Sequence, residues 1–475
     1  MRKWLLFLFT FFVTGTAVAQ QTWNLRTVVE YAMANNITVR FSEVQAALAA
    51  LNLKQSLLSQ FPNAAFSANT ALNSGSNQDP TSFGRITDSY LSAGMQLQSS
   101  ADIFNFFSKR NTIAANEWEM KASIANVAKI KNDIALTAAN AYLQILLAKE
   151  QEKITLVQVA QSQAQLSTVR KQVDAGALPE LNATQLEAQL ANDSVNYITA
   201  KGNVTQSILA LKSYLSLDAA TPFEVELPPV ESIPVEAIGD LQPEYVYNLA
   251  LTNQPLQQYN ALKLKAADRN IAANRGAMYP TASLYGSLGS GFNSKALQVT
   301  SATPINAPFA NVNVNGTSYG VFLQDPLKQY TYGKTGFFNQ LGDNFRQSFG
   351  LNLNVPIFNG GILRSNYERS KLNYKSLELQ KVQDDLKLKQ DIYSAYTAAL
   401  IALEKFNASR KAVETNERSL LFAGKRFEVG MLGTYDLLIT QNNLLRARLE
   451  YSINQFDYVF KMKVLEFYKG QGLKL

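Results

Sequence analysis

The chain of 475 residues contains no cysteine and no histidine. These two absences exclude disulfide bonds, thiol nucleophiles, Ser-His-Asp triads and the usual zinc or copper ligand sets. Charged residues make up 17% of the chain, below the usual quarter for soluble domains, and there are only 24 glycines and 14 prolines. The composition is therefore neither disordered nor collagen-like. The 44 basic and 37 acidic residues are scattered, so no nucleic-acid partner is expected.

Nothing in the sequence indicates an enzyme, a cofactor or a metal site. Acidic pairs such as Asp384 and Asp385 are typical of solvated helix faces rather than metal ligands. The glycines of the 286–291 segment match a nucleotide-loop pattern, but no helix is expected after them, which that pattern requires.

Residues 1–19 have the features of a signal peptide. Arg2 and Lys3 precede an apolar stretch, and Ala17 to Ala19 form a small-residue cleavage site. The stretch is shorter than the roughly 20 apolar residues of a membrane anchor. Because no cysteine follows, a lipid anchor on an N-terminal cysteine is excluded. No later run has 18 consecutive apolar residues, so a mature chain that crosses a membrane would do so as strands.

The second half of the chain repeats the first. Ala32 to Asn36 recurs as Ala250 to Gln254, and Phe61-Pro62 recurs as Tyr279-Pro280, both 218 residues later. The offset then increases by 36, so the second copy carries about 36 extra residues, expected as a long loop within 281–356. Four further matches share an offset of 254: Ile103 to Asn105 with Ile357 to Asn359, Ala141-Tyr142 with Ala395-Tyr396, Gly176 with Gly430, and Tyr214 with Tyr468.

Both copies predict the same order of elements: one helix, two strands, a very long helix, a turn and a final helix. A rod of some 65 residues, about 100 Å at ~1.5 Å per residue, is too long for a globular core and must pack lengthwise on similar helices. The expected ranges are a first repeat 20–217 with long helix about 107–172 and last helix about 180–216, a proline-rich linker 218–243, a second repeat 244–470 with long helix about 361–428 and last helix about 435–469, and a tail 471–475.

Apolar residues of the second rod recur every three or four positions, as in a coiled-coil seam. They are Leu379, Val382, Leu386, Tyr393, Tyr396, Leu400 and Leu403. The first rod instead carries many alanines that allow close approach of helix backbones: Ala114, Ala115, Ala122, Ala125, Ala128, Ala135, Ala138 and Ala139.

Strands are predicted at about 63–73, 88–99, 281–291 and 346–356. They alternate apolar residues with serine, asparagine, glutamine and glycine, hardly ever with lysine or glutamate. A half-buried sheet on a soluble core is one interpretation; the uncharged polar face fits better a barrel wall with lipid outside and water inside. Four strands cannot close a barrel, so several copies of the chain would have to share one. Eight, twelve or sixteen strands remain open.

Two prolines mark the change from helix to strand. Each biases the residue before it toward extended backbone, so Pro62 and Pro280 are expected where a helix gives way to a strand. The strand-to-helix change in copy two is expected at Pro356, Gly360 and Gly361.

With these motifs the chain resembles the outer-membrane efflux protein family, the TolC-like exit ducts. The matching features are the two alanine-rich starts, the paired prolines, the junction from Pro356 to Gly361 and the turn from Arg426 to Asp436. Copy one departs from the pattern because Asp102 replaces the proline and Phe106-Phe107 replace the glycine pair.

The resemblance implies a mainly α protein with a membrane β-barrel. Three copies would share a twelve-stranded barrel in the outer membrane of a Gram-negative bacterium, above a tunnel of packed periplasmic helices. It also implies passive export, as the exit duct of a tripartite efflux pump or a type I secretion system. The implied partners are a periplasmic adaptor protein and an inner-membrane transporter of the RND or ABC type.

The helix-to-helix turns are the most informative candidate sites. Each places a glycine where a helix needs a left-handed stop, with Pro179 or Thr434 at the start of the next helix. An ordinary helical hairpin would have the same pattern. The resemblance makes the turns the periplasmic tip where the adaptor docks, through Ala175, Gly176 and Leu178 in copy one and Val429, Gly430 and Leu432 in copy two.

Asp436 lies where the family carries an acidic residue that faces the pore. The alternative is a carboxylate stabilised by the helix dipole. In a threefold assembly this residue would form a ring of three carboxylates, which selects cations. Ile439, one helical turn later, indicates weaker selectivity than a doubly acidic entrance.

Two other classes of protein remain possible. A periplasmic adaptor has one helical hairpin flanked by small β-domains, whereas this chain has two hairpins, each preceded by a strand pair. A secreted coiled-coil structural protein would lack the alternating strands and the paired prolines.

Overall fold

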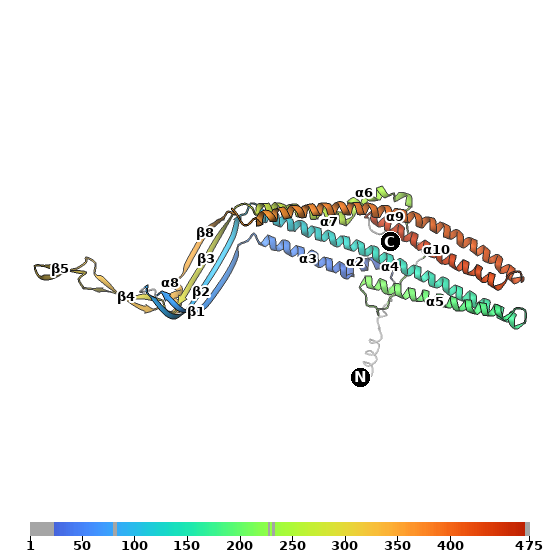
Figure 1. The fold of residues 1–475 in the computed structure, drawn as a ribbon, viewed down its shortest axis with the longest axis horizontal. Coiled ribbons are helices and arrows are strands. Elements are labelled where there is room, and N and C mark those ends of the chain that lie inside the picture. Colours follow the sequence, from blue (N-terminus) through green and yellow to red (C-terminus); the bar gives the residue numbers. More distant parts are fainter. Residues whose placement is uncertain (1–22, 79–82, 227–228, 230–232, 471–475) are drawn as a thin grey trace, which may run out of the picture. The chain divides into compact units, whose positions relative to one another are not determined.

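The computed structural model describes residues 23–78, 83–226, 229 and 233–470. The expected signal peptide and C-terminal tail lie outside these residues. The described chain forms two compact units (Figure 1): a helical unit of the residues up to 53, 115–268 and those from 371, and a strand unit of 54–114 and 269–370.

Long helices dominate the chain. The two longest, α4 and α9, have 67 residues each, which corresponds to about 100 Å. Among the described residues, no helix combines the length and the apolar character needed to cross a membrane. In chain order the helices are α2 (Leu25–Asn35), α3 (Ile37–Leu58), α4 (Ser108–Asp174), α5 (Glu180–Leu215), the 3₁₀ turn η2 (Ile238–Asp240), α6 (Pro243–Asn253), α7 (Pro255–Gly276), the short α8 (Phe337–Asp343), α9 (Ile362–Glu428) and α10 (Thr434–Tyr468).

Each copy begins with two helices, not with the single helix expected from the sequence. The breaks fall at Asn36 and Gln254, whose backbones are extended (ψ 133° and 127°). Asn36 Nδ2 donates to the carbonyl of Tyr214 at 2.8 Å, and Gln254 Nε2 donates to the carbonyls of Phe467 and Tyr468 at 3.0 and 3.2 Å. The amide side chains therefore satisfy the free carbonyls at the ends of α5 and α10.

The repeat is also present in the hydrophobic core. One cluster contains Val28, Ala138 and Leu211 from α2, α4 and α5. The other contains their counterparts in the repeat, Val246, Ile392 and Leu465 from α6, α9 and α10. The same packing of a short helix on the long rod and on the last helix thus occurs twice in the helical unit.

Where the structure describes it, the linker between the copies contains little regular structure. It holds the short turn η2, and an isolated bridge joins Val225 to Trp23. The last residue of the expected linker, Pro243, is already the first residue of α6. Two buried residues of the linker belong to the core clusters: Ile233 to the first and Leu241 to the second. The linker therefore packs on the helices of both copies.

The strand unit is built on an antiparallel four-stranded sheet in the order β1-β2-β3-β8. Asn63 pairs with Ser100, Phe104 with Ala282, and Thr281 with Asn354. The four strand termini that are connected to helices therefore lie side by side at the same end of the sheet. The bounds are β1 (Asn63–Gln78), β2 (Arg85–Phe104), β3 (Thr281–Asn293) and β8 (Arg346–Asn354).

The first two strands are longer than expected. Residues 85–91 of β2 pair with β1 alone, whereas from Ser92 onward β2 also pairs with β3. The ends of β1 and β2 therefore form a two-stranded ribbon beyond the sheet. Its polar residues, such as Ser74 and Asp88, do not alternate with apolar ones, so periodicity gave no signal there.

The extra residues of copy two fold into strands, so the expectation of a long loop is wrong. Two antiparallel ribbons, with a short helix beside them, occupy this insertion, and most of their side chains are exposed. The ribbons pair β4 (Leu297–Ile305) with β7 (Leu327–Lys334), and β5 (Ala310–Val314) with β6 (Thr317–Val321).

The chain does not cover the apolar face of its own sheet. Phe349, Leu351 and Leu353 of β8 are 76%, 63% and 64% exposed, and Leu97 and Leu284 are exposed on β2 and β3. A sheet resting on a soluble core would bury these side chains, so the soluble-core interpretation is wrong.

Much of the predicted seam of α9 is exposed, although Tyr396 packs on the second core cluster and Leu403 is half-buried. Leu379, Val382 and Leu386 are between 50% and 66% exposed, whereas α9 packs on the chain's own core through Leu388 and Ile392. A second exposed stripe with heptad spacing lies on α3, at Ile37, Phe41, Val44, Leu48 and Leu51.

Candidate pore entrance and docking turns

The helices α4 and α5 are joined by a turn with a left-handed glycine. Gly176 has a φ of +75°. Its N–H donates to the carbonyl of Val173, and the N–H of Ala177 donates to that of Gln172, both at 2.8 Å. This is the Schellman pattern, in which glycine adopts the conformation that ends a helix without strain.

The turn between α9 and α10 has the same hydrogen bonds. Gly430 has a φ of +73° and donates to Phe427, while Met431 donates to Arg426 at 2.8 Å. Thr434 is the first residue of α10, as expected, and its side chain is buried. Gly433 is the N-cap residue, so no side chain caps the helix at that position.

The two turns expose different side chains. Ala175 and Gly176 are exposed, whereas Leu178 is half-buried and packs in a cluster with Val169, Leu186, Leu438 and Phe427. In copy two, Val429 and Gly430 are exposed and Leu432 is half-buried. Met431, which we did not predict, is 71% exposed and extends the apolar surface of this turn.

A charged group holds the first turn. Arg170 on α4 forms an ion pair with Glu180 at the start of α5, with Asp174 and Glu187 at 3.8 and 3.9 Å. The hydrogen bond to Glu180 raises the pKa of the Arg170 guanidinium. All four groups are exposed, so the pairs orient the turn more than they stabilise it.

Asp436 is an exposed carboxylate in the first turn of α10. Within the part of the chain that the structure describes, its side chain forms no ion pair. Ile439 and Tyr435 beside it are also exposed. The position lets the helix N-terminus stabilise the carboxylate and also leaves its charge available to a solvent-filled space.

Polar side chains line the contact between the two hairpins. Gln189 of α5 and Asn442 of α10 exchange two amide hydrogen bonds of 3.1 and 3.2 Å. Gln189 also donates to Asp193, a carboxylate that is 1% exposed and accepts a 2.6 Å hydrogen bond from Ser162 of α4. Sequence periodicity cannot identify such a layer, because isolated polar residues on a helix are usually solvated.

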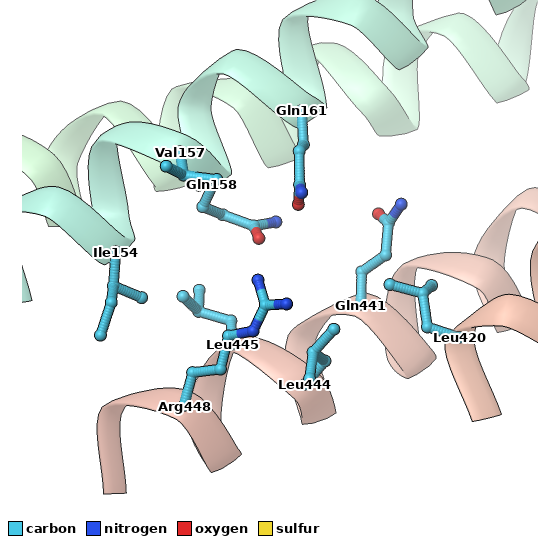
Figure 2. Close-up of a pocket in the computed structure, with 9 residues that line it drawn as sticks. All are labelled: Ile154, Val157, Gln158, Gln161, Leu420, Gln441, Leu444, Leu445 and Arg448. Atoms are coloured by element: carbon cyan, nitrogen blue, oxygen red, sulfur yellow. The ribbon is translucent and has the colours of Figure 1, made fainter. Parts of the chain in front are cut away.

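A small cavity lies beside this polar layer. Figure 2 shows Gln158 and Gln161 of α4 facing Gln441 and Arg448 of α10. The cavity measures about 10 Å³, roughly the space of one water molecule. Gln441 is 6% exposed, and its Oε1 has no hydrogen-bond partner among the described residues. The contact between the hairpins is therefore polar and has room for water.

The predicted junction residues lie between helices and strands. Pro62 directly precedes β1 and Pro280 directly precedes β3, although the preceding helices end four residues earlier, at Leu58 and Gly276. In copy two, Pro356 follows β8, and Gly360 and Gly361 adopt left-handed φ angles of +66° and +76° before α9 begins.

Comparison with known proteins identifies the family. The model of the family described as outer membrane efflux protein matches residues 28–216 and 246–459, which span most of the chain. The chain belongs to the outer membrane efflux protein family. The protein is an exit duct of the outer membrane. The family match therefore confirms the exit-duct prediction rather than the two alternatives, a periplasmic adaptor and a coiled-coil structural protein.

Individual relatives are distant but cover most of the chain. The outer membrane efflux protein BepC of Brucella suis is 22% identical over 78% of this chain and 71% of its own length. The toluene efflux pump outer membrane protein TtgC of Pseudomonas putida is 23% identical over 91% and 81%. The crystal structure of the CmeC outer membrane channel of Campylobacter jejuni matches with a TM-score of 0.73 at 18% identity, over 95% of this chain and 86% of that one. That likeness supports the fold.

Proposed function

We propose that three copies of the chain assemble into one passive duct. Their twelve strands form a single barrel in the outer membrane, and their long helices form a periplasmic tunnel. The observation that carries the proposal is that, among the described residues, no strand pairs with the outer side of β1 or β8, and the apolar stripes of α3 and α9 are largely exposed. No catalytic step is part of this function.

The open sheet edges require partners. β1 and β8 are the outer strands of the sheet, and no other strand among the described residues pairs with their outer sides. In hydrocarbon such groups have no water to bind, so an open edge is not tolerated there. Pairing β8 of one copy with β1 of the next satisfies both edges and closes a ring.

The internal repeat predicts the register of that pairing. Within the chain, β2 of copy one pairs with β3 of copy two, and Gln98 lies opposite Ser287. The corresponding strands are β8 and β1, because β8 follows β2 by 254 residues and β3 follows β1 by 218. Adding 254 to 98 and subtracting 218 from 287 places Asn352 of one copy opposite Asn69 of the next.

The helices continue the same contact. α3 leads into β1, and α9 follows β8, so the two edge strands are connected directly to the helices that carry exposed apolar stripes. Heptad spacing on both helices fits knobs-into-holes packing between neighbouring copies. The copy number of three follows from the family resemblance.

The turns at the far ends of the hairpins provide the contact with the rest of the pump. We assign the docking of a periplasmic adaptor to Ala175, Gly176 and Leu178 and to Val429, Gly430 and Leu432, with Met431 added from its exposure. An inner-membrane transporter of the RND or ABC type would supply the energy. The relatives are named for toluene efflux and pyoverdine export, and the cargo of this chain is left open.

Asp436 would set the charge preference of the entrance. Three carboxylates meet in a threefold ring, and two charges about 6 Å apart repel by ~0.7 kcal/mol in water and ~2.8 kcal/mol at an effective dielectric of 20. A narrow ring therefore attracts cations and repels anions.

Planar-bilayer recordings test both the duct and the ring. Purified protein is expected to conduct ions, and Asp436→Asn is expected to move the reversal potential in a salt gradient toward that of an unselective pore. Asp174→Asn removes the same charge at the other turn and is expected to leave the reversal potential unchanged. Absence of conductance contradicts the duct, and an unaltered potential in Asp436→Asn contradicts the ring.

A further inference from the structure

A cavity of about 560 Å³ lies in the helical unit, where α10 ends and α7 begins. The long helices α4 and α9 line it, together with the first turns of α7 and the last residues of α10. All the lining residues belong to the helical unit. Pockets that bind small organic molecules have volumes of this order. The cavity is therefore large enough to hold such a molecule.

The lining of the cavity combines apolar and aromatic surface. Leu136, Leu388 and Phe467 provide aliphatic and aromatic side chains, and Tyr259 and Tyr468 add two phenol rings. Leu388 and Phe467 are buried, so their side chains are held in place by the surrounding helices. A lining of this kind suits a ligand with an apolar, aromatic body.

Two carboxylates from different helices approach the same ring of the cavity. Asp133 lies on α4 and Asp391 on α9. Burial raises the pKa of the Tyr468 phenol, and the negative charges of Asp391 and Asp133 raise it further, so both carboxylates lie near this ring. Asp133 has the ammonium group of Lys129 at 3.8 Å, whereas Asp391 has no ion-pair partner within the described part of the chain. Asp391 is therefore an uncompensated negative charge beside an aromatic ring.

The other charged groups leave the cavity with an excess of negative charge. Lys263 is paired with Glu119 at 2.5 Å. Asp384 accepts hydrogen bonds of 2.8 and 2.9 Å from two neutral amide side chains, which do not compensate its charge. Lys387 is exposed, and no described carboxylate forms an ion pair with it. With Glu119 included, the carboxylates at the cavity outnumber the lysines by one.

The cavity opens on the side of the long helices that faces away from the short helices α2 and α6. Ala135 of α4 packs in one cluster with α2, and Ile392 of α9 packs in one cluster with α6. Asp133 lies about 160° around α4 from Ala135, and Lys387 about 140° around α9 from Ile392. None of the residues in the exposed stripe of α9 lines the cavity, so a neighbouring copy that packs on this stripe leaves the cavity open.

We propose that the cavity binds an aromatic organic cation on its way through the duct. The cation lies between Asp391 and Asp133 on the ring of Tyr468, and its apolar body covers Leu388 and Phe467. Attraction to the ring adds to attraction by the two carboxylates. The passage through the duct rests on the proposed function, in which α2 and α6 lie outside the long helices and the cavity opens into the tunnel.

Binding of ethidium, an aromatic organic cation, to the purified full-length protein tests the proposal. Fluorescence anisotropy in a nonionic detergent gives the dissociation constant. Asp391→Asn is expected to weaken binding by about tenfold or more, because one charge-assisted contact is lost. Lys387→Gln removes a repelling charge and is expected to strengthen binding by about two- to fivefold. These opposite responses follow from charge and not from a general loss of structure.

Two matched variants remove the same charges outside the cavity. Glu450→Gln on α10 and Lys425→Gln on α9 change exposed residues and are expected to leave the dissociation constant unchanged. The anionic dye 8-anilinonaphthalene-1-sulfonate should show the reverse order, with tighter binding to Asp391→Asn than to the parent chain. If Asp391→Asn does not fold, Lys387→Gln still decides the test. Ethidium affinity that is the same in the parent chain and in Lys387→Gln would overturn the proposal.

Single-channel recording separates this proposal from the duct itself. Ethidium is expected to reduce the current through the parent chain and to reduce it less in Asp391→Asn. An equal reduction in both proteins overturns the cavity as the binding site and leaves the duct intact. A protein that carries no current contradicts the duct, whereas ethidium binding that depends on Asp391 would still support the cavity.

Discussion

Replacing two leucines of the uncovered stripe on α9 is expected to weaken the assembly without weakening the folded chain. Leu379 and Leu386 are 59% and 66% exposed in the single chain. Full burial of a leucine contributes about 1.5–3 kcal/mol, so covering these exposed fractions contributes about 1–2 kcal/mol for each side chain. Leu379→Ala with Leu386→Ala should therefore remove about 2–4 kcal/mol from each contact between copies, and roughly three times that from a closed ring of three.

The assay is the oligomeric state in detergent during stepwise heating, followed by light scattering after size exclusion. We expect the double variant to dissociate at a clearly lower temperature than the parent chain, while its helix content at low temperature stays the same. Leu181→Ala with Ile198→Ala is the matched control, since these residues are 64% and 66% exposed but lie on α5, away from both stripes. Equal dissociation temperatures for the two double variants would refute the assignment of the stripe to an interface between copies.

Two further predictions concern the helical unit. Gly430→Ala places a side chain at a φ of +73° and should destabilise the second turn by about 1–2 kcal/mol. Gly424→Ala, inside α9, should instead stabilise the helix by up to about 1 kcal/mol. Thermal unfolding in which both variants shift the melting temperature in the same direction would contradict this. Burial raises the pKa of Tyr142 to about 12, and its hydroxyl donates to the carbonyl of Glu226 at 2.7 Å. The unfolded phenol ionises near pH 10, so this contribution is complete below pH 10 and is lost between pH 10 and 12, by up to about 3 kcal/mol. Tyr142→Phe should make unfolding less sensitive to pH in that window, and an unchanged pH profile would show that Tyr142 is not the responsible group.

Much of the fold is encoded in patterns that a single sequence reveals. The repeat could be recognised because residues such as Pro62 and Pro280, or Gly176 and Gly430, have physical roles that few other residues can fill. The strands were recognisable because the outer face of a membrane sheet needs apolar residues at every second position. Both signals are local, so they survive without knowledge of the partner copies.

The remaining features depend on contacts across the fold. The break at Asn36 is a helix end only because its side chain reaches the carbonyl of Tyr214, 178 residues away. The spacing of Leu379 and Leu386 predicted a seam but not which surface would cover it, because heptad spacing is the same within a chain and between chains. Phe106 and Phe107 adopt left-handed φ angles of +45° and +61°, which could not be recognised from composition because phenylalanine disfavours that conformation.

Cross-linking between neighbouring copies tests the central claim most directly. The chain has no cysteine, so Asn69→Cys with Asn352→Cys introduces a single reactive pair at the register that the repeat predicts between β1 and β8. Asn69→Cys with Ser348→Cys shifts the second thiol by four residues, about 13 Å along the strand, and serves as the control. Treatment of intact membranes with a short thiol-specific cross-linker should convert the first pair, but not the second, into dimers and trimers and no larger species. Monomers alone, or a ladder that continues beyond three, would contradict a closed ring of three chains that share one barrel.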